Sequence, residues 1–269
     1  MQPGIVKRDE VGITARITQY QPLELTRLYI SHPVLILVAK GEKTVRWPGG
    51  EFVIHTGGAV AIAGGQTLDI TNRGPEGGQY EAYWLVWDDA LLKNFVRQHS
   101  ATTVQPIHQA LPMAAIPDGF HAACERAVQA ICDDAVPVSI AQHHMNEVLL
   151  WLMDAGGLFS MKEIASTSHR VRNMISQQPA HNWAAPDVAE TLAMSEATLR
   201  RKLAAEHTRF SDLLLDVRMS CAIQLLQSTT IPVTRIAQEV GYDSSSHFSD
   251  RFRQRFGFSP SALRRSQAD

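Results

Sequence analysis

The sequence predicts an α+β protein with an N-terminal β domain, helices that follow it, and a C-terminal all-α domain of two tandem helix-turn-helix units. Three observations predict this fold class. Short apolar runs separated by Gly and Pro fill residues 13–87, a helical apolar period begins at Asp118, and one stretch near the end of the chain occurs twice. The 269 residues are enough for two domains, which we expect at 1–160 and 170–269.

The composition is that of a soluble globular protein, with 45% hydrophobic and 19% charged residues. The net charge of −2 hides an asymmetry, because 13 Lys and Arg face 10 Asp and Glu from His169 onward, against 12 and 17 before it. A mildly basic C-terminal part suits a DNA-binding domain beside a regulatory module. Three Cys without metal-ligand spacing, the lack of a signal-peptide core and the lack of a long apolar run predict a cytoplasmic protein without a membrane span.

Residues 13–87 are predicted to form a small β-sandwich or barrel. Their apolar runs are short and end at Gly or Pro turns, which is typical of all-β domains. The clearest predicted strands are Val34–Ala39, Lys43–Trp47, Glu51–His55, Ala59–Ala63 and Tyr80–Trp87.

The β domain contains residues suited to a ligand pocket. Its aromatic side chains could line a cavity or fill an ordinary core, and three nearby cations could either pair with an anionic effector or face solvent. An anion would need such a partner, because burying a carboxylate alone is costly. The aromatic residues are Trp47, Tyr80, Trp84 and Trp87, and the cations are Lys40, Lys43 and Arg46. The candidate ligand-binding residues are Lys43, Arg46, Trp47 and Trp84.

We expect no catalytic centre, no bound metal and no cofactor. A metal enzyme built on a cupin barrel needs a His-x-His pair with a Glu and a later His, whereas His55 stands alone. A metal assay on the purified protein separates the two possibilities, since only the enzyme needs a stoichiometric metal.

Two amphipathic helices are predicted after the β domain. The first begins at Asp118, and the second runs from about Val138 to Asp154 with Ile140 and Met145 on its apolar side. These helices could pack on the β domain or form the seam of a homodimer. Residues 156–169 are expected to be a linker, with a helical turn at Met161–Ala165.

The repeat near the end of the chain predicts two helix-turn-helix units. Residues 188–195 are echoed by residues 236–244, with Ala189 and Ala237 48 positions apart. Each copy has a short apolar helix, a tight turn and a longer helix with Arg on its polar face. Such a second helix fits the major groove of DNA, so the repeat predicts a double-stranded DNA partner.

The first unit is expected to present Arg side chains to DNA. A supporting helix over 170–177 and a scaffold helix with Pro186 at its start precede the turn. Ser195 is a good N-cap for a recognition helix that reaches about Glu206. Leu199 and Leu203 point inward, so the groove-facing side has Ala197, Arg200 and Arg201, and Arg is suited to guanine or phosphate.

The second unit follows a long helix over 210–226, which would place the two recognition helices about one DNA turn, ~34 Å, apart. Gly241 permits its tight turn, and Phe248, Phe252 and Phe256 face its core. The side chains expected to face outward are Ser245, Ser246, Ser249 and Asp250, followed by Arg251, Arg253 and Arg255 as phosphate contacts.

These residues resemble the AraC/XylS family of transcription regulators over residues 171–265. The N-terminal half resembles the family only in layout, as a cupin-like β domain followed by helices. The residues that carry the resemblance are Ile236-Ala237, Gly241-Tyr242, Ser246-His247-Phe248, Phe252, Phe256-Gly257 and Ser259-Pro260, with Arg218, Ala222, Leu225 and Leu226 in the linking helix.

The resemblance implies an N-terminal domain that binds an effector or dimerises, RNA polymerase as a partner, and control of transcription, most often activation. Groove-facing residues carried over by position are Ala197, Arg200, Arg201, Ser245, Ser246, Ser249 and Asp250. Asp250 departs from the basic residue common at that place, so we expect the first unit to supply more of the specificity. The alternatives are a regulator without a small-molecule effector, controlled by a protein partner or its own abundance, and a cupin-type enzyme fused to a DNA-binding domain.

Overall fold

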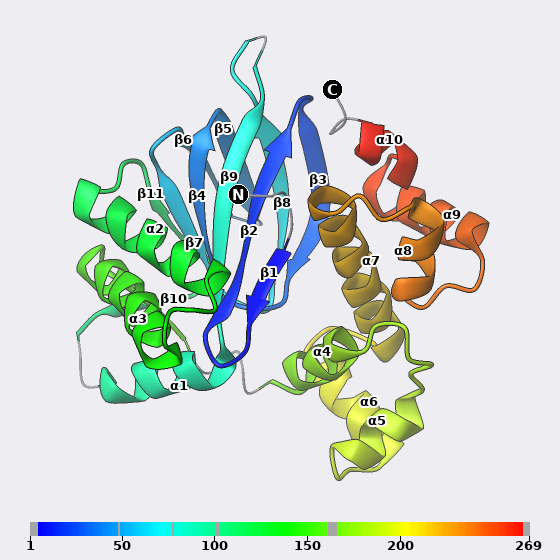
Figure 1. Ribbon diagram of the computed structural model, residues 1–269. Helices are drawn as coiled ribbons and strands as arrows, with labels where there is room; N and C mark the ends of the chain where they lie inside the picture. The colour runs from blue at the N-terminus through cyan, green and yellow to red at the C-terminus, as the bar shows by residue number, and fades with distance from the viewer. Residues whose placement is uncertain (1–4, 48, 77, 101–102, 161–165, 266–269) are drawn as a thin grey trace.

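A computed structural model describes residues 5–47, 49–76, 78–100, 103–160 and 166–265. The β-rich half and the helical half lie side by side, with one long helix, α7, next to the sheets (Figure 1). This arrangement confirms the predicted α+β fold class. None of the helices in the described ranges is both long enough and apolar enough to cross a membrane.

Two antiparallel sheets form the β domain. The six-stranded sheet has the order β1 (Ile5–Arg8), β2 (Gly12–Gln19), β9 (Tyr80–Trp87), β4 (Val34–Lys40), β7 (Ala59–Ile62) and β11 (Ala110–Met113). The four-stranded sheet has the order β3 (Leu23–Ile30), β8 (Gln66–Arg73), β5 (Glu42–Trp47) and β6 (Gly50–His55). Side chains alternate between the two faces of a strand, so Val45 is buried while its neighbour Arg46 is exposed.

Helices α1 (Asp89–Gln98), α2 (Asp118–Cys132) and α3 (Val138–Asp154) pack on the six-stranded sheet and share its core. Arg8 of β1 fixes the α2–α3 connection, since its guanidinium donates to the backbone oxygens of Ala130 and Asp133 at 2.5 and 3.0 Å. The apolar face of the helix pair therefore packs on the β domain. Ile140, predicted to lie on that buried face, is instead 47% exposed, because the buried face of α3 is formed by Ala141, Met145, Val148, Leu149 and Leu152.

Some local predictions were wrong or incomplete. The segment 156–169 is not all linker, because β12 (Gly157–Phe159) pairs in parallel with β10 (Gln105–Ile107) and a helix begins at Thr167. Helix α1 was not predicted. The helical turn expected at Met161–Ala165 lies outside the described residues.

The C-terminal half is all-α. Its helices are α4 (Thr167–Gln177), α5 (Ala185–Thr191), α6 (Glu196–Ala205), α7 (Phe210–Ser228), α8 (Val233–Glu239), α9 (Ser245–Phe256) and α10 (Pro260–Arg265). Helices α4 to α6 pack with the first part of α7 around a core of their own. Helices α8 and α9 share a continuous core with the later part of α7 and the inner faces of the sheets. The second helix-turn-helix unit is thus packed more closely with the β domain than the first.

Candidate nucleic-acid interface and pocket

The two helix-turn-helix units repeat the same hydrogen bond at their turns. Met194 N donates to Ala189 O at 2.9 Å, and 48 residues later Tyr242 N donates to Ala237 O at 2.8 Å. The sequence repeat therefore corresponds to a repeated structural unit.

The turn of each unit contains a residue in the left-handed region, Ala193 with φ 53° and Gly241 with φ 83°. A Cβ at Gly241 would lie 2.5 Å from the guanidinium of Arg218 and 2.8 Å from Pro179 O. The first unit accommodates an alanine at this angle, whereas the second needs glycine because Pro179 and Arg218 leave no space for a Cβ.

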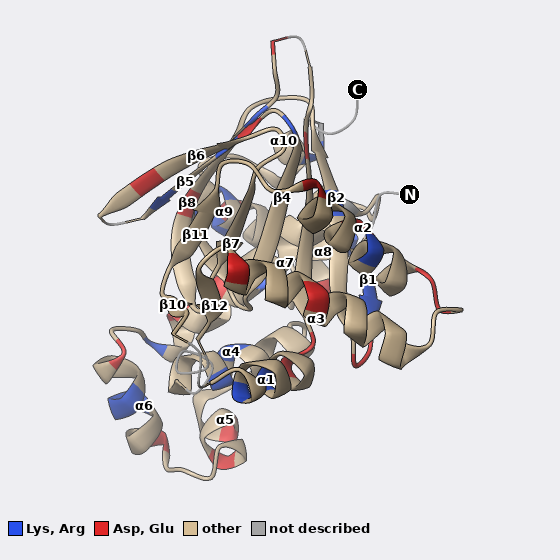
Figure 2. Cartoon of the chain, turned by 90° about the vertical axis from the view of Figure 1, so that its left-hand side faces the viewer, with Lys and Arg blue, Asp and Glu red and all other residues tan. Residues whose placement is uncertain are grey.

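The first recognition helix, α6, presents a basic face to solvent. Ser195 caps it, with its hydroxyl accepting from Thr198 N at 3.2 Å. Leu199 and Leu203 are buried. The opposite side is exposed and contains the predicted residues Ala197, Arg200 and Arg201. Figure 2 shows this basic helix at the end of the molecule remote from the sheets, where a duplex can reach it.

Arg200 is not fully free on that face. Its guanidinium pairs with Glu196, one helical turn earlier, at 2.5 Å, and the Arg200 side chain is 76% exposed. An exposed pair of this kind contributes little to stability, so the guanidinium can exchange Glu196 for a base or a phosphate. Arg201 is also exposed.

The second recognition helix, α9, presents mostly small polar side chains. Ser244 caps it by accepting from His247 N at 3.3 Å, and Phe248, Phe252 and Phe256 are buried. Asp250 pairs with Arg253 at 3.3 Å. Among the predicted contact residues, Ser249 is half-buried, and the exposed ones are Ser245, Ser246, Asp250, Arg251 and Arg253.

Arg255, expected among the phosphate contacts, faces the interior. Its side chain is 8% exposed and its guanidinium lies 2.9 Å from the carboxylate of Asp216 in α7. The expectation failed because the helix turns about 100° per residue, which carries position 255 to the side that faces α7.

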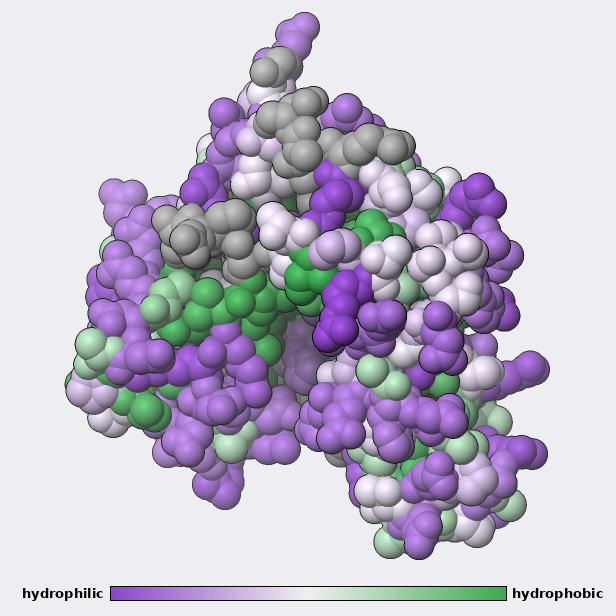
Figure 3. Space-filling model, turned by 45° about the vertical axis from the view of Figure 1, so that its right-hand side comes forward, coloured by the Kyte–Doolittle hydropathy of each residue, from purple (hydrophilic) through white to green (hydrophobic). Residues whose placement is uncertain are grey.

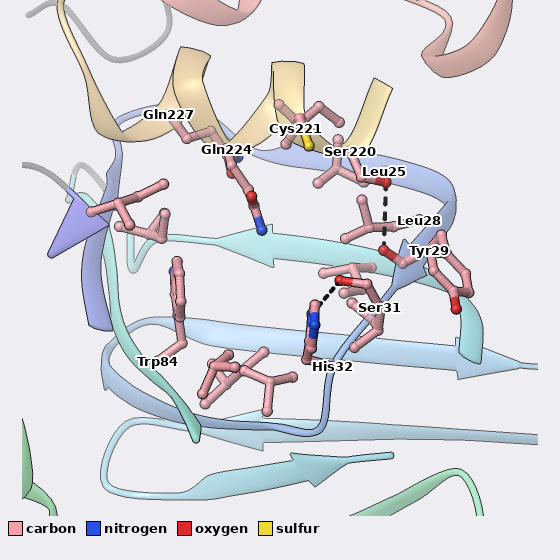
Figure 4. A pocket seen from close by; sticks show the side chains of 18 of the residues that line it. Leu25, Leu28, Tyr29, Ser31, His32, Trp84, Ser220, Cys221, Gln224 and Gln227 are labelled. Atoms are coloured by element: carbon pink, nitrogen blue, oxygen red, sulfur yellow. Dashed lines mark hydrogen bonds between the residues drawn. The ribbon is translucent and has the colours of Figure 1, made fainter. Parts of the chain in front are cut away.

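A cavity of about 320 Å³ lies between the β domain and α7. The space-filling view shows a hollow between the two halves of the molecule, with hydrophobic surface beside it (Figure 3). Apolar side chains form most of its wall, including Ile13, Ile17, Leu25, Ile36 and Ile70. Helix α7 contributes Ser220, Cys221, Gln224 and Gln227. Figure 4 shows Gln224 directed from α7 toward the strands, with Trp84 and His32 directed toward α7.

Lys43 is the charged group at this cavity whose environment is most unusual. It is 4% exposed, and its Nζ donates to Asn72 Oδ1 at 2.6 Å. Asn72 in turn donates to Gln19 at 3.0 Å, and the ring of Tyr80 lies 5.6 Å from the amine. Burial lowers the pKa of Lys43 to about 7. A neutral amide cannot balance the charge, so an anion entering the cavity would gain a strong partner.

The predicted ligand-binding residues do not all meet at the cavity. Lys43 and Trp84 line it. Arg46 lies on the outer face of β5, where it pairs with Glu51 at 2.5 Å in solvent. Trp47 packs edge-on against Phe52, with ring centroids 5.0 Å apart. Strand alternation accounts for Arg46, since positions 43 and 46 lie on opposite faces.

Residues that tertiary structure brings to the cavity, or to the hydrogen bonds behind Lys43, could not be found from local sequence. Asn72 and Gln19 come from two different strands, and Gln224 comes from a helix more than 150 residues away. Of the other predicted aromatic residues, Tyr80 lines the cavity, while Trp87 lies in the core and donates to Met145 O at 2.9 Å.

Two helix-turn-helix units on one linking helix, beside a β domain with a cavity, define a class of DNA-binding proteins with a regulatory module. The chain matches a model described as a helix-turn-helix domain over residues 188–266. It matches a second model, described as the ExsA N-terminal regulatory domain, over residues 33–157. With the resemblance of its C-terminal motifs, these matches show that the chain belongs to the AraC/XylS family of transcription regulators.

Named relatives agree with this assignment. The chain is 42% identical over 97 residues to the HTH-type transcriptional regulator YdeO of Escherichia coli K12, a match that covers 36% of this chain and 38% of YdeO. It is 27% identical over 179 residues to the urease operon transcriptional activator of Escherichia coli, covering 65% and 60% of the two chains. The chain thus spans about two fifths of the length of the first relatives it matches.

The fold also matches solved structures over nearly its whole length. An apo form of ToxT from Vibrio cholerae, carrying a single substitution, superposes with a TM-score of 0.73 at 12% identity, covering 97% of this chain and 100% of ToxT. Wild-type ToxT bound to an unsaturated fatty acid gives a TM-score of 0.70 at 12% identity, covering 97% and 98%. At this identity the likeness establishes the fold alone.

Proposed function

We propose that the chain is a sequence-specific, DNA-binding transcriptional activator whose β domain binds a small anionic effector. The observation that carries the DNA-binding part is the pair of capped recognition helices with exposed polar side chains, joined by α7. We assign the role of groove reading to the predicted residues: Ser195, Ala197, Arg200, Arg201, Ser245, Ser246, Ser249, Asp250, Arg251 and Arg253. The proposed division is a regulatory domain over 1–160 and a DNA-binding domain over 170–269.

Activation rather than repression is supported by the name of the relative that covers most of this chain, a urease operon transcriptional activator. We therefore propose RNA polymerase as a partner. We also propose that the protein has a regulatory rather than an enzymatic role, in the cytoplasm. A homodimer is supported by three exposed apolar side chains of α3, Val138, Ile140 and Leu150.

The effector proposed for the cavity is an amphipathic monocarboxylate. The apolar wall suits a hydrocarbon chain, and Lys43 is placed to pair with a carboxylate. The ToxT structure with a bound unsaturated fatty acid supports the same class of ligand for this fold. Without such a ligand Lys43 is a poorly compensated buried amine, so binding should stabilise the protein.

Selection from random duplexes, followed by gel shifts at fixed salt, tests the DNA-binding function. We expect the full chain to enrich one motif and to bind it at least about a hundredfold more tightly than a scrambled duplex. Equal affinity for both would contradict a sequence-specific role. Transcription with purified polymerase from a template with the enriched motif then separates activation from repression.

Thermal shifts with oleate and methyl oleate test the effector. Oleate should raise the melting temperature of the parent and of Arg46→Ala, but not of Lys43→Met, and the uncharged ester should have little effect. If oleate and related acids leave the parent unchanged, control by a protein partner becomes the better account.

A further inference from the structure

One carboxylate joins the two helix-turn-helix units. Asp216 projects from α7 between two guanidinium groups, with Oδ2 3.7 Å from Arg172 Nη2 and Oδ1 2.9 Å from Arg255 Nη2. Arg172 belongs to α4, which supports the first unit, and Arg255 belongs to α9, the recognition helix of the second unit. The three side chains are 15%, 10% and 8% exposed, so this ion cluster is largely shielded from solvent.

The electrostatics make Asp216 the member on which the cluster depends. A buried guanidinium needs a partner, and here two of them share one carboxylate. Without that negative charge, two shielded positive charges would face each other, and α4 and α9 would be driven apart. A surface ion pair would not have this effect, because solvent screens it.

The same cluster contacts the β domain. The guanidinium of Arg172 lies over the ring of Tyr29, 3.4 Å from its centroid. Tyr29 is 3% exposed, belongs to β3 and lines the cavity. The position of α4 is therefore set from two sides, by Asp216 and by the wall of the cavity.

We propose that Asp216 is a positioning residue that fixes the distance between the recognition helices α6 and α9, and thereby the spacing of the two half-sites that the protein reads. The effect on half-site spacing rests on the proposed DNA-binding function, whereas the effect on the distance between α6 and α9 does not. Successive grooves are reached only at a separation of about one DNA turn, ~34 Å, and each inserted base pair also rotates one half-site about the axis. Two recognition helices held at a fixed distance should therefore bind tightly at only one half-site spacing. Two helices free to move apart should bind several spacings with similar affinity.

The geometric part is tested by a distance measurement on the full chain without DNA. Nitroxide labels are placed at Lys202 in α6 and Gln254 in α9 through a genetically encoded keto side chain, which leaves the native cysteines intact. The parent and Asp212→Asn, an exposed carboxylate one turn earlier in α7, should give one narrow distance distribution. Asp216→Asn should give a broadened or shifted one. Should that variant fail to fold, Arg172→Met replaces it, because it removes the link to the first unit while Asp216 and Arg255 stay paired. A folded variant with the parent's distribution would overturn the proposal.

The functional part uses the selected duplex with zero, one or two base pairs inserted between its half-sites. The parent and Asp212→Asn should lose about tenfold or more in affinity with the first insertion, whereas Asp216→Asn should lose less than about threefold. Equal spacing profiles of parent and Asp216→Asn would contradict the positioning role. If the parent binds no duplex specifically, the proposed DNA-binding function fails, and the distance measurement still decides the geometric claim.

Discussion

At the scale of single residues, Lys43 shows how far sequence alone can reach. Its place on a strand near aromatic residues predicted a pocket cation, but the same reasoning selected Arg46, which faces solvent. The difference arises because only the fold determines which face of β5 is turned toward the cavity. Asn72 accepts from the amine and in turn donates to Gln19, and these two residues lie on separate strands and have no local signal.

The depressed pKa of Lys43 makes a prediction about stability and pH. The folded chain holds this pKa at about 7, against 10.5 for an ordinary lysine. Between these values the unfolded chain takes up a proton that the folded chain does not, so stability is lost as the pH falls from 10.5 to about 7. Lys43→Met removes this effect. Its stability relative to the parent should therefore rise as the pH falls, and reach a few kcal/mol by about pH 7.

Urea unfolding of the parent and Lys43→Met at pH 7, 8.5 and 10 measures the difference. It should grow as the pH falls and become constant below about 7, since both states of the parent are then protonated. A difference that does not depend on pH would contradict the burial of an uncompensated amine at this position.

His169 of α4 gives a second pH-dependent prediction. Its pKa is lowered to about 4, first by burial and then by the nearby charges of His32, Arg172 and Lys93, against the raising effect of Asp89. The His32 ring lies 6.2 Å away across the contact with the β3–β4 turn. The folded pKa of His169 lies below the ordinary value of 6.5. Burial of the neutral ring therefore contributes its full stability above pH 6.5, and this contribution is lost as the pH falls toward 4.

Unfolding followed from pH 7 to pH 4 should therefore show a smaller loss of stability in His169→Gln than in the parent. His121→Gln, which changes an exposed histidine of α2, serves as the control and should follow the parent. Parallel curves of stability against pH for the parent and His169→Gln would mean that protonation of His169 does not affect folding.

At the scale of elements, the strongest predictions concerned helices with clear boundaries. Ser195 and Ser244 cap α6 and α9, and the 48-residue repeat has the same turn geometry in both copies. Helix α1 had readable signals that were missed, since Asp88 caps it and Leu91, Leu92 and Phe95 face the core. The pairing of β10 with β12 could not be predicted, because strands of three residues far apart in the chain have no periodic signal.

The basic face of α6 predicts the effect of two substitutions. Arg200→Ala or Arg201→Ala should weaken binding to the selected duplex by about 1–3 kcal/mol for each base that the side chain no longer reaches, with folding intact. Arg97→Ala, which removes an exposed arginine of α1, is the matched control and should bind as the parent does. Gel shifts at one salt concentration compare the three, and unchanged affinity in both α6 variants would exclude this helix as a reader.

At the scale of the whole molecule, the two-domain division predicted from composition meets one complication. The second helix-turn-helix unit and the β domain share a core through α7, with Met219, Ile223 and Leu226 among the buried residues. The first unit has a separate core. Sequence patterns could not reveal the shared core, because one apolar face of α7 packs against both its own unit and the β domain.

This shared core predicts the behaviour of an isolated C-terminal fragment. The fragment should begin at Ser166, since Ser166 caps α4 by accepting from His169 N at 3.1 Å. We expect it to bind the selected duplex more weakly than the full chain, because part of α7 loses its packing and a dimer formed through the N-terminal half can no longer link two readers. Hydrogen exchange should show less protection in α8 and α9 of the fragment than in α5 and α6. A folded fragment without salt-sensitive DNA binding would contradict the proposed division.

We propose that the two recognition helices of one chain read successive major grooves. Methylation interference on the selected duplex tests it most directly, because methylation at guanine N7 blocks contacts in the major groove. We expect two clusters of interfering guanines on one face of the duplex, centred about 10 base pairs apart. A single cluster, or two clusters on opposite faces, would contradict it.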